Sequence, residues 1–288
     1  MKYFLLILCL LSLHLNAQQT AFTGTLDWDK MEFNATAAID LQKAGIKLPA
    51  GRSSAEAMLE DELPELIRPY INEIQADSSS TVADLINRGE LSPATFMEKI
   101  RSLPPALSQD LSSIFAKYTI NLTALGAELI RHSRPQRISA PLIPVSARSY
   151  TGIIIIADEN LPFHGHSASV FALPCLFPKI WDSDMNLIYE RNTIDPALGR
   201  NMGLVKYIGR ESIMRAVPSA INEELAKRVG DNPLLIMARG IFGAVPTDPI
   251  IDKNDALLIL SNENNRRLLT EGRIAIVLDK KALRKNIP

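Results

Sequence analysis

Three short and almost wholly apolar runs constrain this chain most strongly, because each of them must be buried. They are residues 152–157, 234–242 and 274–278. Such runs are typical of strands covered on both faces, and they are too apolar for a solvated sheet edge. The sequence therefore predicts that all three share one mixed sheet. Two helices are expected to pack on it, one that ends at Gly230 and one that is capped by Ser261.

The length and composition predict an α+β protein of two domains. The chain has 288 residues, of which 47% are hydrophobic and 22% charged, as in ordinary globular proteins. Each domain is expected to hold a small mixed or antiparallel sheet with packed helices. The predicted N-terminal domain spans 18–131, a proline-containing linker spans 132–149, and the C-terminal domain spans 150–279. Residues 280–288 form a short basic segment, for which we expect a solvated tail.

The first 17 residues have the pattern of a cleavable signal peptide. Lys2 precedes an apolar run, and a small-residue cleavage site ends at Ala17. Cys9 lies inside the apolar run, so we expect no lipidation. The sequence predicts a periplasmic or secreted protein with no transmembrane segment after cleavage. Removal of the signal leaves Cys175 as the single cysteine, which excludes an intramolecular disulfide.

Charge and motifs exclude several functional classes. The formal net charge is −1, so no global field attracts nucleic acid, and no nucleic-acid partner is expected. The chain contains no GxSxG, GxGxxG, Walker-type or HExxH motif. We therefore expect no catalytic residues and no cofactor.

In the first half, apolar residues at spacings of three and four predict a long amphipathic helix from Ser53 to Ile74. Pro64 and Pro69 interrupt this pattern. An interior proline costs about 3 kcal/mol, so a kink or a break is expected near Leu63. A half-buried strand is predicted over residues 117–125.

Two histidines and a cysteine are the residues with possible chemistry. His164 and His166 flank one glycine, and such a pair can hold a transition metal if a further ligand joins it. Cys175 with a histidine would form a nucleophile pair, but its apolar neighbours favour a buried and inert thiol. We expect structural roles for Cys175, Trp181, Gly230 and Ser261.

Several short motifs of the second half resemble a family of exported bacterial envelope proteins, the flagellar assembly protein T group and related outer-envelope lipoproteins. The motifs are Tyr150-Thr151-Gly152, Phe177-Pro178-Lys179-Ile180-Trp181-Asp182, Leu187-Ile188-Tyr189, Asn232-Pro233-Leu234-Leu235, Asp255-Ala256 through Ile259, Ser261-Asn262-Glu263, and Ile274 to Asp279. The resemblance implies a non-enzymatic periplasmic protein that supports envelope or flagellar assembly. The lipoprotein members carry a cysteine after the cleavage site, and this chain lacks it.

The sequence thus predicts a non-enzymatic envelope protein that acts by binding other envelope proteins. The alternative is a secreted metal-dependent hydrolase that uses the loop of His164 and His166. Stoichiometric metal in the purified protein, lost on substitution of both histidines, would favour the alternative.

Overall fold

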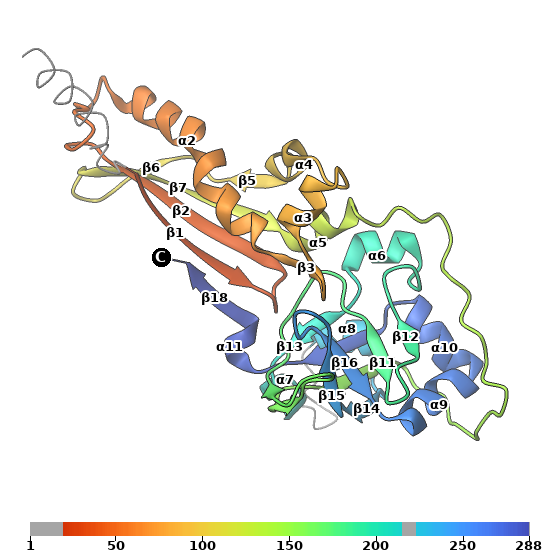
Figure 1. Ribbon diagram of the computed structural model, residues 1–288. Helices are drawn as coiled ribbons and strands as arrows, with labels where there is room; N and C mark the ends of the chain where they lie inside the picture. Colours follow the sequence, from red (N-terminus) through yellow and green to blue (C-terminus); the bar gives the residue numbers. More distant parts are fainter. Residues whose placement is uncertain (1–19, 215–222, 288) are drawn as a thin grey trace, which may run out of the picture.

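The computed structural model describes residues 20–214 and 223–287 and divides them into two α+β domains (Figure 1). The predicted signal peptide at 1–17 lies outside the described residues. The N-terminal domain is an antiparallel sheet with a long helix on one face. The C-terminal domain combines a parallel sheet, a mixed sheet and several short helices.

The antiparallel sheet follows the order β18-β1-β2-β7-β5, with β6 also paired to β7. Along β2 and β7 every second residue is buried, as expected for a sheet with one covered face. The predicted strand at 117–125 is therefore real but begins and ends earlier. The strands are β1 (Thr20–Asp27), β2 (Glu32–Asp40), β5 (Ile100–Ser102), β6 (Ala106–Leu107), β7 (Ser113–Asn121) and β18 (Arg284–Ile287).

Helix α2 (Arg52–Asn72) covers this sheet and runs without a break through Pro64 and Pro69. Of the two predicted alternatives, the break near Leu63 is therefore wrong, and the kink stays a prediction. One stripe of the helix is buried against the sheet, and it consists of Ala55, Leu59, Leu63, Ile67 and Ile71. Burial of each large apolar side chain contributes about 1.5–3 kcal/mol, so together they exceed the cost of two interior prolines.

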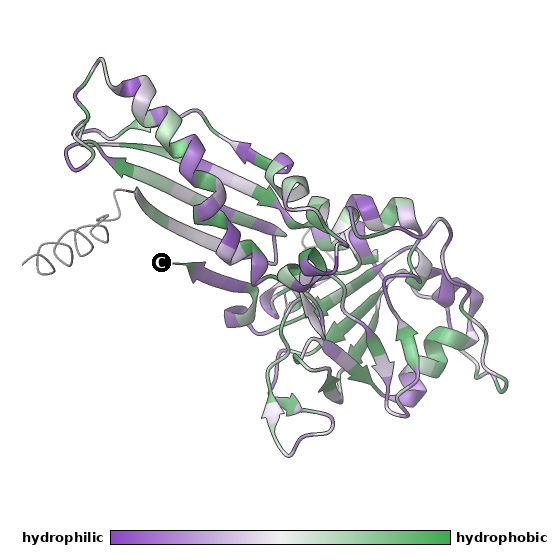
Figure 2. Cartoon of the chain, turned by 45° about the horizontal axis from the view of Figure 1, so that its top comes forward, coloured by the Kyte–Doolittle hydropathy of each residue, from purple (hydrophilic) through white to green (hydrophobic). Residues whose placement is uncertain are grey.

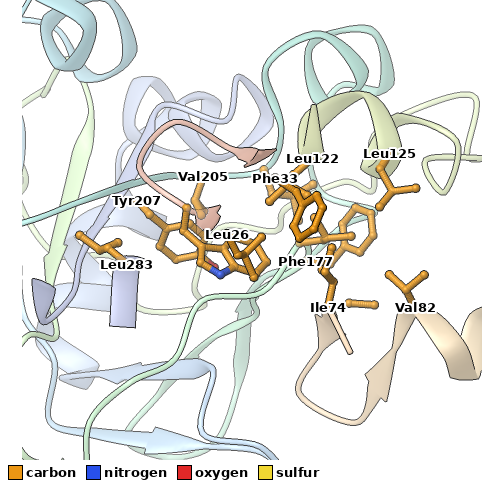
Figure 3. Packing of buried hydrophobic residues seen from close by; sticks show 14 of the residues in the cluster. Leu26, Phe33, Ile74, Val82, Leu122, Leu125, Phe177, Val205, Tyr207 and Leu283 are labelled. Atoms are coloured by element: carbon orange, nitrogen blue, oxygen red, sulfur yellow. The ribbon is translucent and has the colours of Figure 1, made fainter. Parts of the chain in front are cut away.

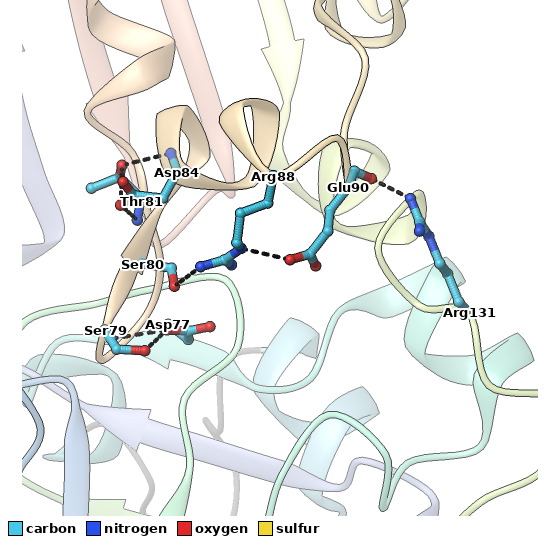
Figure 4. Close-up of polar contacts among 8 residues, drawn as sticks. All are labelled: Asp77, Ser79, Ser80, Thr81, Asp84, Arg88, Glu90 and Arg131. Carbon is cyan, nitrogen blue, oxygen red and sulfur yellow. Dashed lines mark hydrogen bonds and ion pairs between the residues drawn. The ribbon is translucent and has the colours of Figure 1, made fainter.

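A short segment with many polar contacts follows α2 in the N-terminal domain (Figure 4). It comprises β3 (Gln75–Asp77), β4 (Ser80–Thr81) and α3 (Val82–Asn87). Thr81 and Asp84 form a capping box at the start of α3. Arg88 bonds the Ser80 hydroxyl at 3.1 Å and Glu90 at 2.7 Å. The helices α4 (Pro93–Glu98) and α5 (Leu122–Ala127) complete the domain.

The basic segment 280–288 is not a solvated tail, which corrects the prediction. It forms α11 (Lys280–Leu283) and β18, and β18 pairs antiparallel with β1 from Gly24↔Ile287 to Asp27↔Arg284. Leu283 and Ile287 are buried. These two apolar residues lie four positions apart, a spacing too sparse to be read from the sequence as a periodic face. The end of the second domain therefore completes the sheet of the first.

The three apolar runs of the sequence do share one sheet, which confirms that prediction. The order is β13-β17-β8-β14, and all pairs are parallel instead of mixed. The expectation that no run lies at an edge is wrong, because β14 is an edge strand. The strands are β8 (Ile153–Ile156), β13 (Lys206–Ile208), β14 (Leu234–Met237) and β17 (Ile274–Val277).

The run 234–242 is divided between two sheets. Its second part, β15 (Gly240–Phe242), pairs with β16 (Asp248–Ile251) in a mixed sheet of order β12-β11-β16-β15. The other members of this sheet are β11 (Ile180–Asp182) and β12 (Leu187–Tyr189). The hairpin of β9 (Leu161–Pro162) and β10 (Ser169–Val170) lies against β15 through a bridge from Phe163 to Ile241.

Short helices surround the sheets, and the structure corrects the prediction for Ser261. Residues 257–260 belong to α9 (Lys253–Ser261), capped by Asp252, and not to a strand. Asn262, not Ser261, caps α10 (Glu263–Thr270) through its side-chain oxygen. Asparagine is as good a cap as serine, so the sequence could not decide between neighbours. The remaining helices are α6 (Pro196–Met202), α7 (Glu211–Met214) and α8 (Glu223–Val229). Part of the predicted helix that ends at Gly230, residues 215–222, lies outside the described residues.

One apolar cluster continues from the first domain into the second (Figure 3). Phe33, Leu122 and Leu125 of the first domain meet Phe177 of the second in this cluster. Backbone bonds cross the same boundary, from Leu176 N–H to Gln75 O at 3.1 Å and from Phe177 N–H to Ala76 O at 2.8 Å. The two domains are therefore joined by a shared core and not only by the chain between them.

Candidate functional site at the open edge of the parallel sheet

The edge strand β14 carries two exposed apolar side chains. Leu235 is 55% exposed and Met237 is 47% exposed, whereas Leu234 and Ile236, which alternate with them, are buried. The alternation follows from strand geometry, since successive side chains point to opposite faces. Leu234 and Ile236 fill the main core, and Leu235 and Met237 lie on the other face.

Among the residues that the structure describes, the opposite face of the sheet is only partly covered. A small apolar cluster of Ile154, Ile208, Ala275 and Val277 packs there with Leu225 and Val229 of α8. Helix α8 lies over the central strand β17. Leu235 and Met237 lie outside this cluster, and Ile156 at its margin is half-buried. These three residues, Ile156, Leu235 and Met237, form what we call the β14 surface.

The backbone of β14 also has an open side. Its bonds to β8 use the N–H groups of Leu234 at 2.9 Å and of Ala238 at 2.9 Å. Peptide groups of a strand alternate in direction, so those of Leu235 and Met237 point away from β8. Within residues 20–214 and 223–287 no further strand pairs with this side. An open row of donors and acceptors beside apolar side chains is the pattern that binds another extended segment.

The carboxyl ends of the parallel strands are occupied by ion pairs. This end of a sheet is where α/β proteins commonly bind charged ligands. Here Arg210, after β13, forms a two-point contact with Asp158, after β8, with one N–O distance of 2.7 Å, and it contacts Glu159 at 3.0 Å. The Asp158 carboxylate raises the pKa of Arg210 further above its usual range. Arg210 thus holds two carboxylates together and leaves one net negative charge, so this end resembles a structural clamp more than a site for an anionic ligand.

The structure places His164 and His166 on the exposed loop of the β9–β10 hairpin. The rings lie on different aromatic partners: His166 stacks on Phe163 at 4.2 Å, and His164 meets the edge of Phe242 at 5.7 Å. Among the described residues no group of three or more His, Cys, Asp or Glu side chains is placed to hold a metal ion. The structure therefore supplies no third ligand for the hydrolase alternative within those residues.

Cys175 lies in the interior, where it has no exposed surface. Its backbone N–H donates to the Tyr207 hydroxyl at 3.1 Å, and that hydroxyl donates to the Cys175 carbonyl at 2.9 Å. Burial raises the pKa of the Cys175 thiol well above its ordinary value. His164 and His166 are exposed, so the structure does not bring a Cys/His nucleophile pair together.

The other residues singled out in the sequence have local structural environments. Trp181 is half-buried in β11 and meets Phe242 edge-on at 5.3 Å. Gly230 follows α8 with φ of +72°, where a Cβ atom would lie 2.5 Å from Thr151. Ser261 accepts a hydrogen bond from the Val145 N–H at 2.9 Å. Ser261 therefore holds the linker.

Sequence reasoning missed a buried carboxylate and a buried cation. Asp248 accepts hydrogen bonds from the Lys179 N–H at 3.1 Å and the Thr247 hydroxyl at 2.9 Å. Arg228 donates to the carbonyls of Met202, Gly203 and Leu204 at 2.7–3.0 Å, beyond the C-terminus of α6. Burial lowers the pKa of Arg228 to about 10. A charged residue in a sequence favours exposure, so no signal marked either of them.

Fold and surface together define a two-domain α+β protein in which the second domain presents an open parallel edge. Comparison with known families identifies both domains. Residues 19–128 match the N-terminal domain family of Treponema pallidum Tp0624, and residues 152–280 match the family of its second domain. Each of these two segments is thus similar to one domain family of Tp0624. No curated protein in the comparison matches the chain.

Neither matching family model is one of the flagellar assembly protein T group, so that resemblance stays a prediction. Strand β18 lies beyond the second match, although it belongs to the sheet of the first domain. Within the described residues no helix has both the length and the apolar character needed to cross a bilayer.

Proposed function

We propose that this chain is a non-enzymatic envelope protein that binds another envelope protein by strand addition at β14. The observation that carries the proposal is the free side of β14, where Leu235 and Met237 combine exposed apolar side chains with outward backbone groups. A parallel sheet is usually covered on both faces and protected at its edges. The occupant is an extended segment of a partner protein, because an extended segment satisfies the backbone and covers the side chains together.

The predicted signal peptide supports a location in the periplasm or outside the cell. From the resemblance to the flagellar assembly protein T group, we infer that the chain takes part in envelope or flagellar assembly. That part of the proposal rests on the sequence motifs alone. It predicts that the partner captured at β14 belongs to an envelope or flagellar assembly.

A photo-reactive amino acid at position 237 tests the proposal in intact cells. We expect it to form a covalent adduct with one envelope protein. The same amino acid at Leu103, an exposed apolar residue of the N-terminal domain, is the matched control. Equal adduct patterns at both positions, or none at 237, would contradict the proposal.

A proline substitution separates strand addition from simple apolar contact. Met237→Pro removes an outward N–H without removing a bond to β8, since edge positions of this kind tolerate proline. Adduct formation from a reactive group at Leu235 is expected to fall at least tenfold in this variant. Met237→Leu keeps the donor and the apolar side chain and should retain the adduct. If Met237→Pro binds as well as Met237→Leu, the partner does not add a strand at β14.

A further inference from the structure

A second surface, independent of β14, lies on the segment between the domains. Residues 130–152 contain no helix or strand and follow the outside of the C-terminal domain past α10 and α9 (Figure 1). We call residues 131–150 the strap. Its first part is bonded to the domain by Gln136 N–H to Asn192 O at 2.7 Å and by His132 Nε2 to Ile194 O at 2.9 Å.

The strap is fixed again beyond its middle. Asn262 donates to Ala147 O at 2.9 Å, and Asn265 donates to Arg148 O at 2.9 Å while accepting from the Tyr150 N–H. Asn265 is itself buried, with 1% of its surface exposed. Hydrogen bonds to the C-terminal domain therefore fix the strap on both sides of its middle, so it is not a loose connector.

Between these anchors the strap presents two large aliphatic side chains entirely to solvent. Leu142 is fully exposed, and Ile143 is 83% exposed. These adjacent residues form an apolar tip, and Figure 2 shows a green stretch where the strap bends furthest outward. Pro141 and Pro144 bracket the pair, and proline has no N–H donor. The backbone at the tip therefore has fewer N–H donors that would lose hydrogen bonds to water on leaving the solvent.

Arginines precede and follow this apolar tip along the strap. Residues 129–157 contain no Asp or Glu but four arginines. A groove of about 680 Å³ separates residues 135–140 from α10, and its charged lining is Arg137, Arg266, Arg267 and Glu263. Arg267 pairs with Glu271 at 3.2 Å. Arg134 and Arg137 have no ion-pair partner among the described residues. The local surplus is positive, although the whole chain is nearly neutral.

We propose that the strap binds an anionic phospholipid surface, with Leu142 and Ile143 entering the headgroup–acyl boundary and Arg134 and Arg137 contacting lipid phosphates. Two terms, apolar insertion and attraction to anionic lipid, together give peripheral membrane binding that neither gives alone. A lipid surface suits the tip better than a protein groove does, because the tip is convex and arginines outnumber carboxylates beside it. Near such a surface each arginine contributes roughly fivefold in affinity.

Flotation with vesicles tests the proposal, using wild type and variants prepared as the same exported chain so that residues 1–17 contribute equally. We expect binding to vesicles of phosphatidylcholine mixed with phosphatidylglycerol, and at least tenfold weaker binding to phosphatidylcholine alone. Leu142→Ser/Ile143→Ser should weaken binding to the mixed vesicles about tenfold or more. Arg134→Gln/Arg137→Gln should weaken it roughly 25-fold and remove most of the salt dependence.

The matched control is Leu103→Ser/Leu111→Ser, which removes two exposed leucines of the N-terminal domain and should leave binding unchanged. All variants lie outside the buried core, so thermal unfolding should match wild type. Equal binding to neutral and anionic vesicles would overturn the proposal. So would wild-type binding by Leu142→Ser/Ile143→Ser, or a photo-adduct from position 143 to a protein with no vesicle binding. Met237→Pro should bind vesicles like wild type, which separates this surface from the proposed β14 site.

Discussion

Asp248, the first residue of β16, has no exposed surface, and one of its carboxylate oxygens has no hydrogen-bond partner. Burial raises the pKa of Asp248, against the lowering effect of its bonds from Lys179 and Thr247. A group whose pKa is raised by folding binds its proton more tightly in the folded state. Its contribution to stability is complete below the unfolded pKa and is lost as pH rises through the folded pKa.

We therefore expect Asp248→Asn to flatten the pH dependence of stability. The free energy of unfolding of wild type, relative to this variant, should decline as pH rises above about 4, the unfolded pKa of an aspartate. Urea unfolding at a series of pH values measures the difference.

Asp110 provides a control of opposite sign for that experiment. Bonds from Ser108 and Ser112 lower the pKa of Asp110 to about 2. Stability from this carboxylate is present above the unfolded pKa and is lost as pH falls through the folded one. Asp110→Asn should therefore lower the free energy of unfolding at neutral pH, and this difference from wild type should disappear at low pH. If the free energies of unfolding of wild type and Asp248→Asn change with pH in parallel, folding does not shift the pKa of the Asp248 carboxyl.

The Cys175 thiol should be protected from reagents in the native protein. It is fully buried, and burial raises its pKa, which lowers the fraction of reactive thiolate. If exposure requires an opening of about 3 kcal/mol or more, native labelling by a maleimide is at least about 100-fold slower than in denaturant. Mass spectrometry of timed samples gives both rates. Comparable rates would place Cys175 near the surface.

At the scale of elements, helix α2 is destabilised by its interior prolines and stabilised by burial of its apolar stripe. The two contributions can be measured separately. Pro69 is exposed within the helix, so Pro69→Ala should add a backbone N–H donor without loss of core packing. We expect the free energy of unfolding to rise by about 1–3 kcal/mol. Ile67→Ala, two positions earlier on the buried stripe, should lower it by about 2–5 kcal/mol. Chemical denaturation measures the free energy of unfolding of both variants. A lower value for Pro69→Ala than for wild type would show that Pro69 stabilises the native helix.

The apolar pattern predicted which elements exist better than it predicted their partners. The runs now assigned to β8, β14 and β17 are recognisable because a buried strand needs no polar residues. Their parallel order depends on connections far away in sequence. Residues 257–260 belong to α9 because Asp252 caps that helix five residues earlier, a signal outside the short run itself. The β14 surface could not be found, since exposed and buried residues of its run are equally apolar.

At the scale of the whole molecule, β18 joins the two domains, so truncation after Asp279 should destabilise the protein. The truncation removes two buried side chains, Leu283 and Ile287, and the pairing with β1. We expect a loss of about 3–6 kcal/mol from the apolar burial. Thermal unfolding measures this loss, and amide exchange in β1 should accelerate.

Point variants separate the contribution of the two buried side chains from the contribution of the backbone that the truncation removes. Leu283→Ala/Ile287→Ala should reproduce most of the effect of the truncation. Lys280→Ala/Lys281→Ala changes exposed residues of the same segment and should stay within about 0.5 kcal/mol of wild type. A truncated protein as stable as the full chain would show that β18 contributes nothing to the fold.

The pairing of β1 with β18 also has a consequence for the order of folding. The partners Gly24 and Ile287 lie roughly 260 residues apart, and contacts of such long sequence separation form slowly. The N-terminal domain is made first, yet it can be completed only after the second domain has emerged and folded. Throughout that interval one side of β1 is bare and open to pairing with another chain. A chaperone that covers β1 during this interval would therefore protect the chain from pairing with another molecule.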